Sequence, residues 1–201
     1  MTLKNYFVRI TLSALLMLSF SILKAQVVIN EYSCSNLSQI PDNYQEYGDW
    51  FELYNAGSSS VNLGGYYLSD DSLNNTKWQI PASVTIGANS FAVFWCSGRN
   101  LVSGTNYHTN FKLTQTKNNP EFIVLSDPSA VRLDYVRLSK KTQLGHSRGR
   151  TFNGIPTWSI FTTPTPNGTN NNSTAYFDYA DRPDYSLGAG YYTGSVTVAI
   201  T

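Results

Sequence analysis

The amino-acid sequence predicts an all-β protein built as a sandwich of packed sheets, and three observations support this prediction. Short β-rich runs recur between segments of Gly, Asn, Ser and Pro. No window of 11 or more residues keeps the apolar period of a helix. Aromatic residues make up 14% of the chain and charged residues 13%, a composition that can fill a core and argues against disorder. Strand spacing of this kind is typical of an all-β sandwich.

Eight runs are expected to form the strands. In chain order they span residues 27–33, 50–54, 66–69, 77–80, 83–86, 91–96, 121–125 and 131–138. The run at 91–95 is apolar without alternation, so we expect a central strand with both faces covered. The run at 131–138 alternates as a strand does, but each face mixes apolar and charged residues. Which of its faces is buried therefore stays open.

The first 25 residues have the form of a secretory signal peptide. Lys4 and Arg9 precede an apolar stretch of 14 residues from Ile10 to Leu23, and the small residue Ala25 stands at the expected cleavage point. An uncleaved membrane anchor is the alternative, although a spanning helix needs about 20 apolar residues. We therefore expect a mature chain of residues 26–201 that is secreted or held in the cell envelope, without a membrane span.

Removal of this leader reverses the net charge of +1. The leader holds three cations and no acid, so 11 basic residues then face 13 acidic ones, for a net charge of −2. A nearly neutral mature chain argues against a nucleic-acid binder that works through its overall charge. Any anion recognition is therefore expected to be local.

Residues 26–168 are expected to form one domain, followed by a linker at 169–181. The linker is predicted because residues 167–174 are polar and of low complexity, with no means of packing a core. Residues 182–201 have the pattern of a second β module that is cut short. We therefore interpret the sequence as a fragment of a longer, multidomain protein.

Several phrases follow one another in a characteristic order. They are Val28-Ile29-Asn30-Glu31, Asp49-Trp50-Phe51-Glu52-Leu53-Tyr54-Asn55, Val61-Asn62-Leu63-Gly64-Gly65-Tyr66, Trp78-Gln79-Ile80-Pro81, Leu133-Asp134-Tyr135-Val136, Ser147-Arg148-Gly149-Arg150 and Thr163-Pro164-Thr165-Pro166-Asn167. This ordered set resembles the lamin-tail domain, which implies an immunoglobulin-like β-sandwich over residues 27–168 with a proline-marked edge strand at 78–81. Residues 35–48 depart from the pattern as a long insertion between the first two strands.

The resemblance implies an interaction module without general catalytic machinery. Such domains occur in nuclear lamins and in exported bacterial proteins, beside nucleases, phosphatases or spore-coat-like kinase domains. Residues 182–201 resemble the start of the chitobiase/β-hexosaminidase C-terminal module, another sandwich that accompanies enzymes. Both resemblances point to a modular exported protein whose chemistry, if any, lies outside residues 1–201.

One pentapeptide, Gly145-His146-Ser147-Arg148-Gly149, satisfies the G-x-S-x-G pattern of a nucleophile elbow. That elbow requires a following helix and a triad His later in the chain. Both His residues precede Ser147, and Pro156 and Pro164 interrupt any following helix. We therefore interpret the pentapeptide as a loop and assign no catalytic residue to it.

The two cysteines and two histidines are Cys34, Cys96, His108 and His146, and they lack the paired spacing of a zinc site. In an oxidising compartment the cysteines either form a disulfide or remain as two buried thiols, and the sequence leaves both open. We assign no cofactor to this set and no metal ion.

Acidic residues suggest two further sites, each with a structural alternative. Asp70 and Asp71 begin like a calcium loop that then departs from the EF-hand pattern, so calcium would need a neighbouring loop acid such as Asp49. Their alternative role is to form turns. Glu31 and Glu52 suggest a glycosidase pair, but carboxylates within strands more often accept structural hydrogen bonds.

Five cations occur between residues 137 and 150 with no acid among them. They are Arg137, Lys140, Lys141, Arg148 and Arg150. On one loop they would hold phosphate or an anionic polysaccharide, with an affinity that falls steeply as salt rises. The alternative is a solvated surface loop without a ligand.

The sequence thus favours a non-catalytic extracellular binding or scaffold module of an exported multidomain protein. One alternative is an accessory domain that positions a downstream enzyme on its substrate. Another is a calcium-stabilised sandwich that binds glycans. The partner, either a protein or a polysaccharide at the cell surface, and the oligomeric state remain open.

Overall fold

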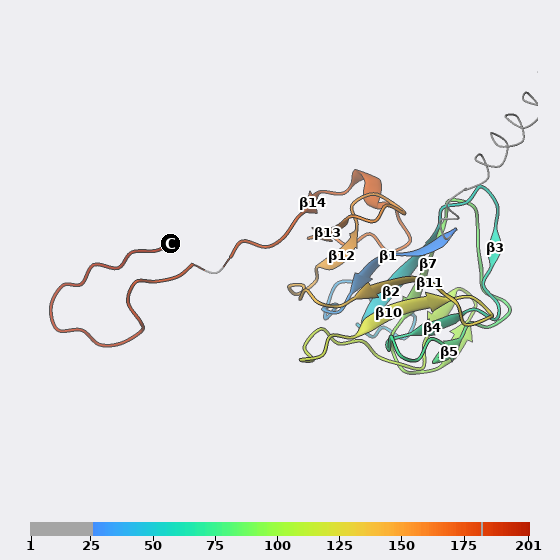
Figure 1. Ribbon diagram of the computed structural model, residues 1–201, viewed down its shortest axis with the longest axis horizontal. Helices are drawn as coiled ribbons and strands as arrows, with labels where there is room; N and C mark the ends of the chain where they lie inside the picture. Colours follow the sequence, from blue (N-terminus) through green and yellow to red (C-terminus); the bar gives the residue numbers. More distant parts are fainter. Residues whose placement is uncertain (1–25, 182) are drawn as a thin grey trace, which may run out of the picture.

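The computed structural model describes residues 26–181 and 183–201, and these residues form an all-β protein (Figure 1). The expected signal peptide at residues 1–25 lies outside this range. The larger sheet contains, in spatial order, β14 (Ala175–Tyr176), β13 (Trp158–Phe161), β12 (Ser147–Arg150), β1 (Val27–Ser33), β2 (Trp50–Asn55), β7 (Phe91–Trp95), β9 (Asn106–His108) and β8 (Leu101–Ser103). The smaller sheet contains β11 (Arg132–Arg137), β10 (Phe122–Ser126), β4 (Tyr67–Ser69) and β5 (Trp78–Gln79).

The main apolar core draws its residues from both sheets, which confirms the predicted immunoglobulin-like β-sandwich. A small ribbon of β3 (Val61–Asn62) and β6 (Thr85–Ile86) lies beside them, and a 3-10 turn, η1 (Asn170–Asn172), precedes β14. Strand β5 is an edge strand, as the proline after it predicts.

Strands β2 and β7 lie side by side in the larger sheet, and their side chains alternate between two apolar clusters. Phe51 and Phe94 point into the main core, where their rings stack with centroids 5.5 Å apart. Trp50 and Trp95 form a second cluster on the outer face, and Ile40 packs against it. This arrangement confirms that β7 is a central strand with both faces covered.

The insertion at residues 35–48 is an ordered loop held by one buried amide. The Nδ2 of Asn36 donates to the carbonyl oxygens of Ile40 at 2.6 Å and Gly48 at 2.9 Å. Its Oδ1 accepts from the N–H of Ile40 at 3.1 Å. Because Ile40 rests on the outer cluster, the loop covers apolar surface of the larger sheet that would otherwise meet water.

The register with β10 settles the orientation of β11. Leu125 pairs with Asp134 and Ile123 with Val136, and the register shifts only beyond these pairs, between Leu125 and Ser126. Leu125 and Ile123 belong to the main core, and residues paired across a ladder share a face of the sheet. Asp134 therefore turns toward the larger sheet, where it meets β1 and β12.

Two polar segments that the sequence analysis assigns outside the sheets pair within the larger one. The predicted loop at 145–149 is wrong in its second half, because Ser147–Arg150 form β12 between β1 and β13. The predicted linker at 169–181 is also corrected in its first part. Asn170 is fully buried and its Nδ2 donates to the carbonyl of Arg150 at 2.8 Å, and β14 then pairs with β13. Residues 183–201 form an open loop outside the sandwich (Figure 1).

Cys34 and Cys96 are free thiols. Ser33 pairs with Trp50, and the N–H of Cys96 donates to the carbonyl of Asp49 at 2.8 Å, so the cysteines flank Asp49 from opposite sides. Two strand spacings amount to about 9.5 Å between their backbones, beyond the roughly 7 Å that a disulfide spans. Burial raises the pKa of both thiols well above its usual range. Of the two fates, the structure favours buried thiols.

Candidate anion-binding pocket

The five cations expected on one loop occupy two different environments. Arg148 and Arg150 lie on β12 and are 8% and 7% exposed. Arg137, Lys140 and Lys141 are exposed. The prediction of a single loop patch is therefore wrong, because two of its members are built into the sheet.

Arg150 is a structural cation whose hydrogen bonds go to the protein itself. Its Nη2 donates to Asp134 Oδ2 at 2.7 Å, its Nε to the carbonyl of Ile29 at 2.7 Å, and its Nη1 to the carbonyl of Ile155 at 2.7 Å. Asp134 Oδ2 also accepts from the N–H of Ile29 at 2.8 Å. One ion pair thus joins β1, β11 and β12, and each nitrogen of this guanidinium donates to the protein itself.

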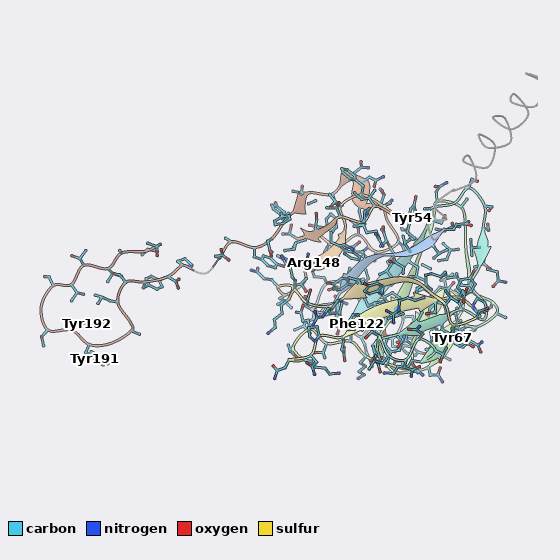
Figure 2. All side chains as sticks on the ribbon, viewed as in Figure 1. Tyr54, Tyr67, Phe122, Arg148, Tyr191 and Tyr192 are labelled. Carbon is cyan, nitrogen blue, oxygen red and sulfur yellow. The ribbon has the colours of Figure 1, made fainter. Side chains whose placement is uncertain are left out.

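Arg148 lies two residues away on the same strand but lacks such partners (Figure 2). It sits opposite Tyr32 of β1 and Ile160 of β13. Within residues 26–181 and 183–201, its Nη1 meets no hydrogen-bond acceptor and no ion pair includes it. An uncompensated buried charge is strongly unfavourable. Arg148 lies near enough to Asp178 to help lower the pKa of that carboxyl, but its Nη1 has no hydrogen bond among the described residues, so the position favours a further anion.

An open pocket of about 200 Å³ gives such an anion access to Arg148. The other residues that line it are Tyr32, Val136, Arg137, Ser139, Lys140 and Trp158. Arg137 ends β11 and Lys140 follows it in the next loop, so two exposed cations accompany the buried one. Three of the five predicted cations therefore share one cavity, whereas Lys141 and Arg150 do not line it.

Two aromatic rings form part of the pocket wall. The rings of Tyr32 and Trp158 meet at 5.7 Å with a tilt of 49°, and the guanidinium of Arg150 lies over Trp158 at 5.4 Å. Burial raises the pKa of Tyr32, so its phenol is neutral and adds no negative charge beside Arg148. Sequence reasoning assigned neither ring to a binding site. Tyr32 reads as a core residue of a strand, and Trp158, which fits the family phrases, shares no short binding motif with Arg148.

A segment that follows β14 contacts the rim of this pocket. Lys140 forms an ion pair with Asp178, and its Nζ lies 5.6 Å from the ring centroid of Phe177. The hydroxyl of Tyr179 accepts from the N–H of Gln143 at 2.9 Å. The hydrogen bond from Lys140 lowers the pKa of Asp178. One rim cation therefore already holds a carboxylate that the chain itself supplies.

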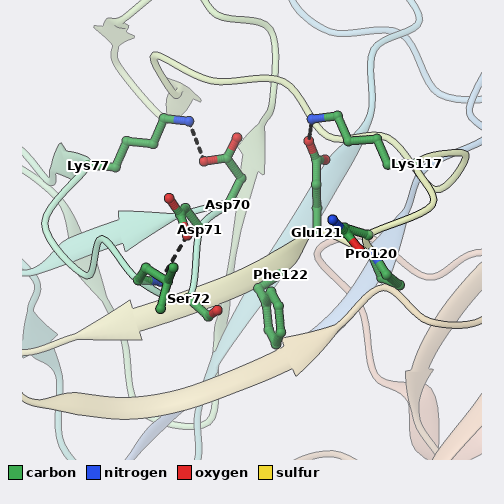
Figure 3. A pocket seen from close by; sticks show the side chains of 10 residues that line it. Asp70, Asp71, Ser72, Lys77, Lys117, Pro120, Glu121 and Phe122 are labelled. Atoms are coloured by element: carbon green, nitrogen blue, oxygen red, sulfur yellow. Dashed lines mark hydrogen bonds and ion pairs between the residues drawn. The ribbon is translucent and has the colours of Figure 1, made fainter.

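A second cavity, of about 310 Å³, lies at the site considered for calcium (Figure 3). Its acids are already in use: Asp70 pairs with Lys77, Glu121 pairs with Lys117, and Asp71 Oδ1 accepts from a backbone N–H at 2.9 Å. Among the described residues, no three His, Cys, Asp or Glu side chains are placed to hold one metal ion. Asp71 has the turn-forming role, and Asp70 and Glu121 serve in ion pairs.

The candidate catalytic residues lie in a closed polar network. Glu31 and Glu52 are fully buried. Glu31 Oε1 accepts from Ser147 Oγ at 2.5 Å and from the N–H of Thr165 at 3.0 Å. Glu52 Oε2 accepts from the N–H of Asn167 at 2.6 Å. These contacts make the two carboxylates acceptors that anchor the 165–167 segment, and Ser147 is fully buried as well.

Burial raises the pKa of both carboxyl groups. For Glu52 the nearby Glu31 raises the pKa further, so it lies well above its usual range. The two acids thus resist holding two negative charges at once. Their hydrogen bonds fit a structural role.

The two histidines serve separate local structures. His108 is fully buried, with its ring nitrogens 3.0 Å from Ser97 Oγ and 2.7 Å from Asn43 Oδ1. Burial lowers the pKa of its imidazole. Through its contact with Asn43, His108 joins the insertion loop to β9. His146 instead contacts the Tyr179 hydroxyl at 2.9 Å.

These features define an immunoglobulin-like β-sandwich with a pocket that presents one unpaired arginine. The sequence matches the Lamin Tail Domain over residues 22–141, and the chain belongs to that family. No curated protein matches the chain. Arg148 and Trp158 come from strands that follow the matched range, so the pocket joins family-matched residues with later ones. No helix among the described residues is long and apolar enough to cross a membrane.

Proposed function

We propose that this protein is a non-catalytic binding or scaffold module that holds an anionic partner in the Arg148 pocket. The observation that carries the proposal is that Arg148, which is 8% exposed and whose buried Nη1 has no hydrogen-bond partner among the described residues, lines an open pocket. A bound anion would supply the hydrogen bonds and charge that the sandwich leaves out. The family, whose fold is a β-sandwich, is compatible with such a role.

The proposed setting is outside the cell, either secreted or in the cell envelope, as in bacterial proteins of this type. The support is the leader, with a basic start, 14 apolar residues and a small residue before the mature chain. In such a setting the partner would be a protein or a polysaccharide of the cell surface. Electrophoresis and N-terminal sequencing of the exported protein would test this, and Gln26 as the first residue is the expected result.

The module is further proposed to belong to a multidomain protein. Residues 182–201 resemble the start of a chitobiase/β-hexosaminidase C-terminal module, and in the structure Asp184 and Thr201 exchange backbone hydrogen bonds at 2.9 and 3.0 Å. This ladder favours β structure there. The second candidate function follows: an accessory domain that positions a downstream enzyme on its substrate. Sequencing the gene beyond the codon of Thr201 decides it, since an enzyme domain there supports this candidate and its absence removes it.

The binding proposal is tested by isothermal titration of residues 26–201 with short anionic oligomers at low salt. Arg148→Gln is expected to weaken binding about tenfold or more, because a charge-assisted hydrogen bond is lost. Lys141→Gln is the matched control, since it removes the same charge from the same stretch but does not line the pocket. Equal affinities of wild type and Arg148→Gln would contradict the proposal. Thermal unfolding of both variants checks that each is folded.

A calcium-stabilised glycan binder is the weaker alternative. Asp70 is paired with Lys77 and Asp71 is engaged in a turn, which leaves few free oxygens for the ion. Addition of a chelator is expected to leave the melting temperature unchanged. A clear drop on chelation, reversed by calcium, would restore this alternative.

A further inference from the structure

We propose that the Arg148 pocket takes the carboxylate of an acidic polysaccharide, with one uronate residue in the cavity and its neighbours along the rim. This inference rests on the proposed function and names the ligand class for the same site. Four features of the pocket carry it: the kind of donors, the aromatic wall, the volume and the charges outside the cavity.

The donors in the pocket favour a carboxylate over a phosphate or sulfate. Phosphate sites are commonly built from successive backbone N–H groups in loops or at helix N-termini. Here Tyr32 and Arg148 lie on strands that are paired on both sides, so their backbone groups serve the ladders. The N–H of Ser139 donates to the carbonyl of Arg137 at 2.9 Å. The pocket thus offers mainly side chains, led by a planar guanidinium that pairs bidentately with carboxylates and phosphates alike. The shortage of backbone donors is the feature that favours a carboxylate.

The wall and the volume fit a sugar ring. Trp158 is partly exposed, and Trp158, Tyr32 and Val136 give the cavity an apolar side. Aromatic residues combine an apolar body with a polar tip, which suits the apolar face of a ring that carries hydroxyl groups. The cavity of about 200 Å³ is smaller than the roughly 300 Å³ at which drug-sized ligand pockets begin. One monosaccharide unit is therefore the expected occupant.

The charges outside the cavity favour a polymer with repeated acids. Arg137 and Lys140 are both exposed, so they can meet the acidic groups of adjacent units while Arg148 holds the central one. The ion pair of Lys140 with Asp178 indicates that this rim accepts a carboxylate. A ligand with a single acid would leave Arg137 without a role and Lys140 with Asp178 alone.

The test compares oligogalacturonate with its methyl ester, a sulfated oligosaccharide and a single-stranded oligonucleotide, at equal length and salt, by isothermal titration to residues 26–201. We expect oligogalacturonate to bind most tightly and the methyl ester to lose about tenfold or more, because esterification removes the charge. Arg148→Gln should produce a similar loss. Acetate is titrated as a carboxylate without a ring. Trp158→Leu should weaken the binding of oligogalacturonate more than the binding of acetate, since only the uronate has a ring to stack. Lys141→Gln should stay within about twofold, because it lies outside the cavity.

The outcomes separate the inference from the function beneath it. If the sulfated sugar or the oligonucleotide binds more tightly and depends on Arg148, the anion pocket stands and the uronate inference is overturned. If the methyl ester binds as well as the acid, the carboxylate has no role and the inference also fails. If none of the ligands responds to Arg148→Gln, the proposed function itself fails.

Discussion

Arg148 and Arg150 share one face of one strand, yet their roles differ because of a single acid. Asp134 reaches Arg150 at 2.7 Å, while Nη1 of Arg148 meets no acceptor among the described residues. The pairing of Asp134 with the core residue Leu125 places Asp134 on the inward face. No sequence pattern indicates which arginine forms the ion pair with Asp134, although Asp134 stands only three residues before the cationic run.

Loss of this acid should destabilise the fold. Asp134→Asn leaves a buried guanidinium without its counter-charge, and we expect the free energy of unfolding to fall by about 3 kcal/mol. Arg148→Met, which removes a charge that has no partner, should be neutral or stabilising. Urea unfolding of both variants measures the difference. Equal effects of the two substitutions would contradict the assignment of structural and ligand-binding roles.

The Glu31–Glu52 pair should make stability depend on pH. Burial raises both pKa values above the unfolded value of 4.5, so the folded state binds protons more tightly than the unfolded chain. The stability from this source is fully present below pH 4.5 and is lost as pH rises through the folded pKa values. Burial also raises the pKa of Asp49, from 3.8 to about 6. Its contribution to stability is therefore also lost as pH rises, between these two values.

Glu52→Gln tests this pH dependence. The variant should show a flatter profile of melting temperature between about pH 5 and 8 than wild type, because one of the two coupled carboxyls no longer titrates. Asp181→Asn removes an exposed carboxylate and serves as the control, with a profile that follows wild type. Profiles of equal slope for Glu52→Gln and wild type would contradict the account of the buried pair.

At the scale of elements, most of the long apolar strands were predictable, whereas the polar strand β12 and the short strands β13 and β14 were not. Strand β1 coincides with the predicted run, β2 and β7 differ from theirs by one residue at one end, and β10 and β11 differ by one residue at each end. Strand β12 contains no apolar residue and β14 is only two residues long, so periodicity gives no signal for them. Strand β12 is stabilised by polar contacts on one face, where Ser147 bonds Glu31, and it presents Arg148 on the other.

Gly149 should be the most sensitive position of β12. A Cβ added there would lie 2.8 Å from Asn170 Nδ2, 2.8 Å from a ring carbon of Phe161 and 3.1 Å from Cγ of Glu31. Gly149→Ala is therefore expected to destabilise the fold by about 1–3 kcal/mol, as overpacking does. Gly104→Ala controls for a glycine with open space, although its φ of 61° adds a local backbone cost. A Gly149→Ala variant as stable as wild type would show that β12 lies elsewhere.

The strand order also predicts the state of the cysteines. Because β2 lies between the strands that precede Cys34 and Cys96, the native fold keeps the two thiols apart. Thiol titration of the exported protein in denaturant should find both groups reactive, and titration without denaturant should find little reaction, since burial raises both pKa values. A missing pair of thiols in denaturant would indicate a disulfide and contradict this prediction.

For the whole molecule, the sequence was sufficient for the fold but not for the pocket. The ordered sequence motifs predicted the β-sandwich and the family, and the family model matches the chain. The pocket instead assembles Tyr32, Arg148 and Trp158, which are more than 100 residues apart at the extremes. Only the paired register of β1, β12 and β13 brings them together, and no short pattern encodes that register.

The tail that follows β14 should influence binding. Asp178 holds Lys140 at the rim, so an acidic ligand must compete with it there. Asp178→Asn is expected to raise affinity for oligogalacturonate about twofold to fivefold, an effect that shrinks with added salt. Titrations at low and high salt measure this. Weaker binding by the variant would contradict competition and make Asp178 a part of the site.

The central claim, that Arg148 receives an anion while Arg150 belongs to the fold, is tested most directly by NMR of the arginine side chains. Oligogalacturonate is titrated into ¹⁵N-labelled protein, with the Arg148→Gln and Arg150→Lys variants used to assign the two guanidinium signals. The account predicts a saturable shift of the Arg148 signal and an unmoved Arg150 signal, which its pair with Asp134 holds in place. An unmoved Arg148 signal, or equal shifts of both, would contradict it.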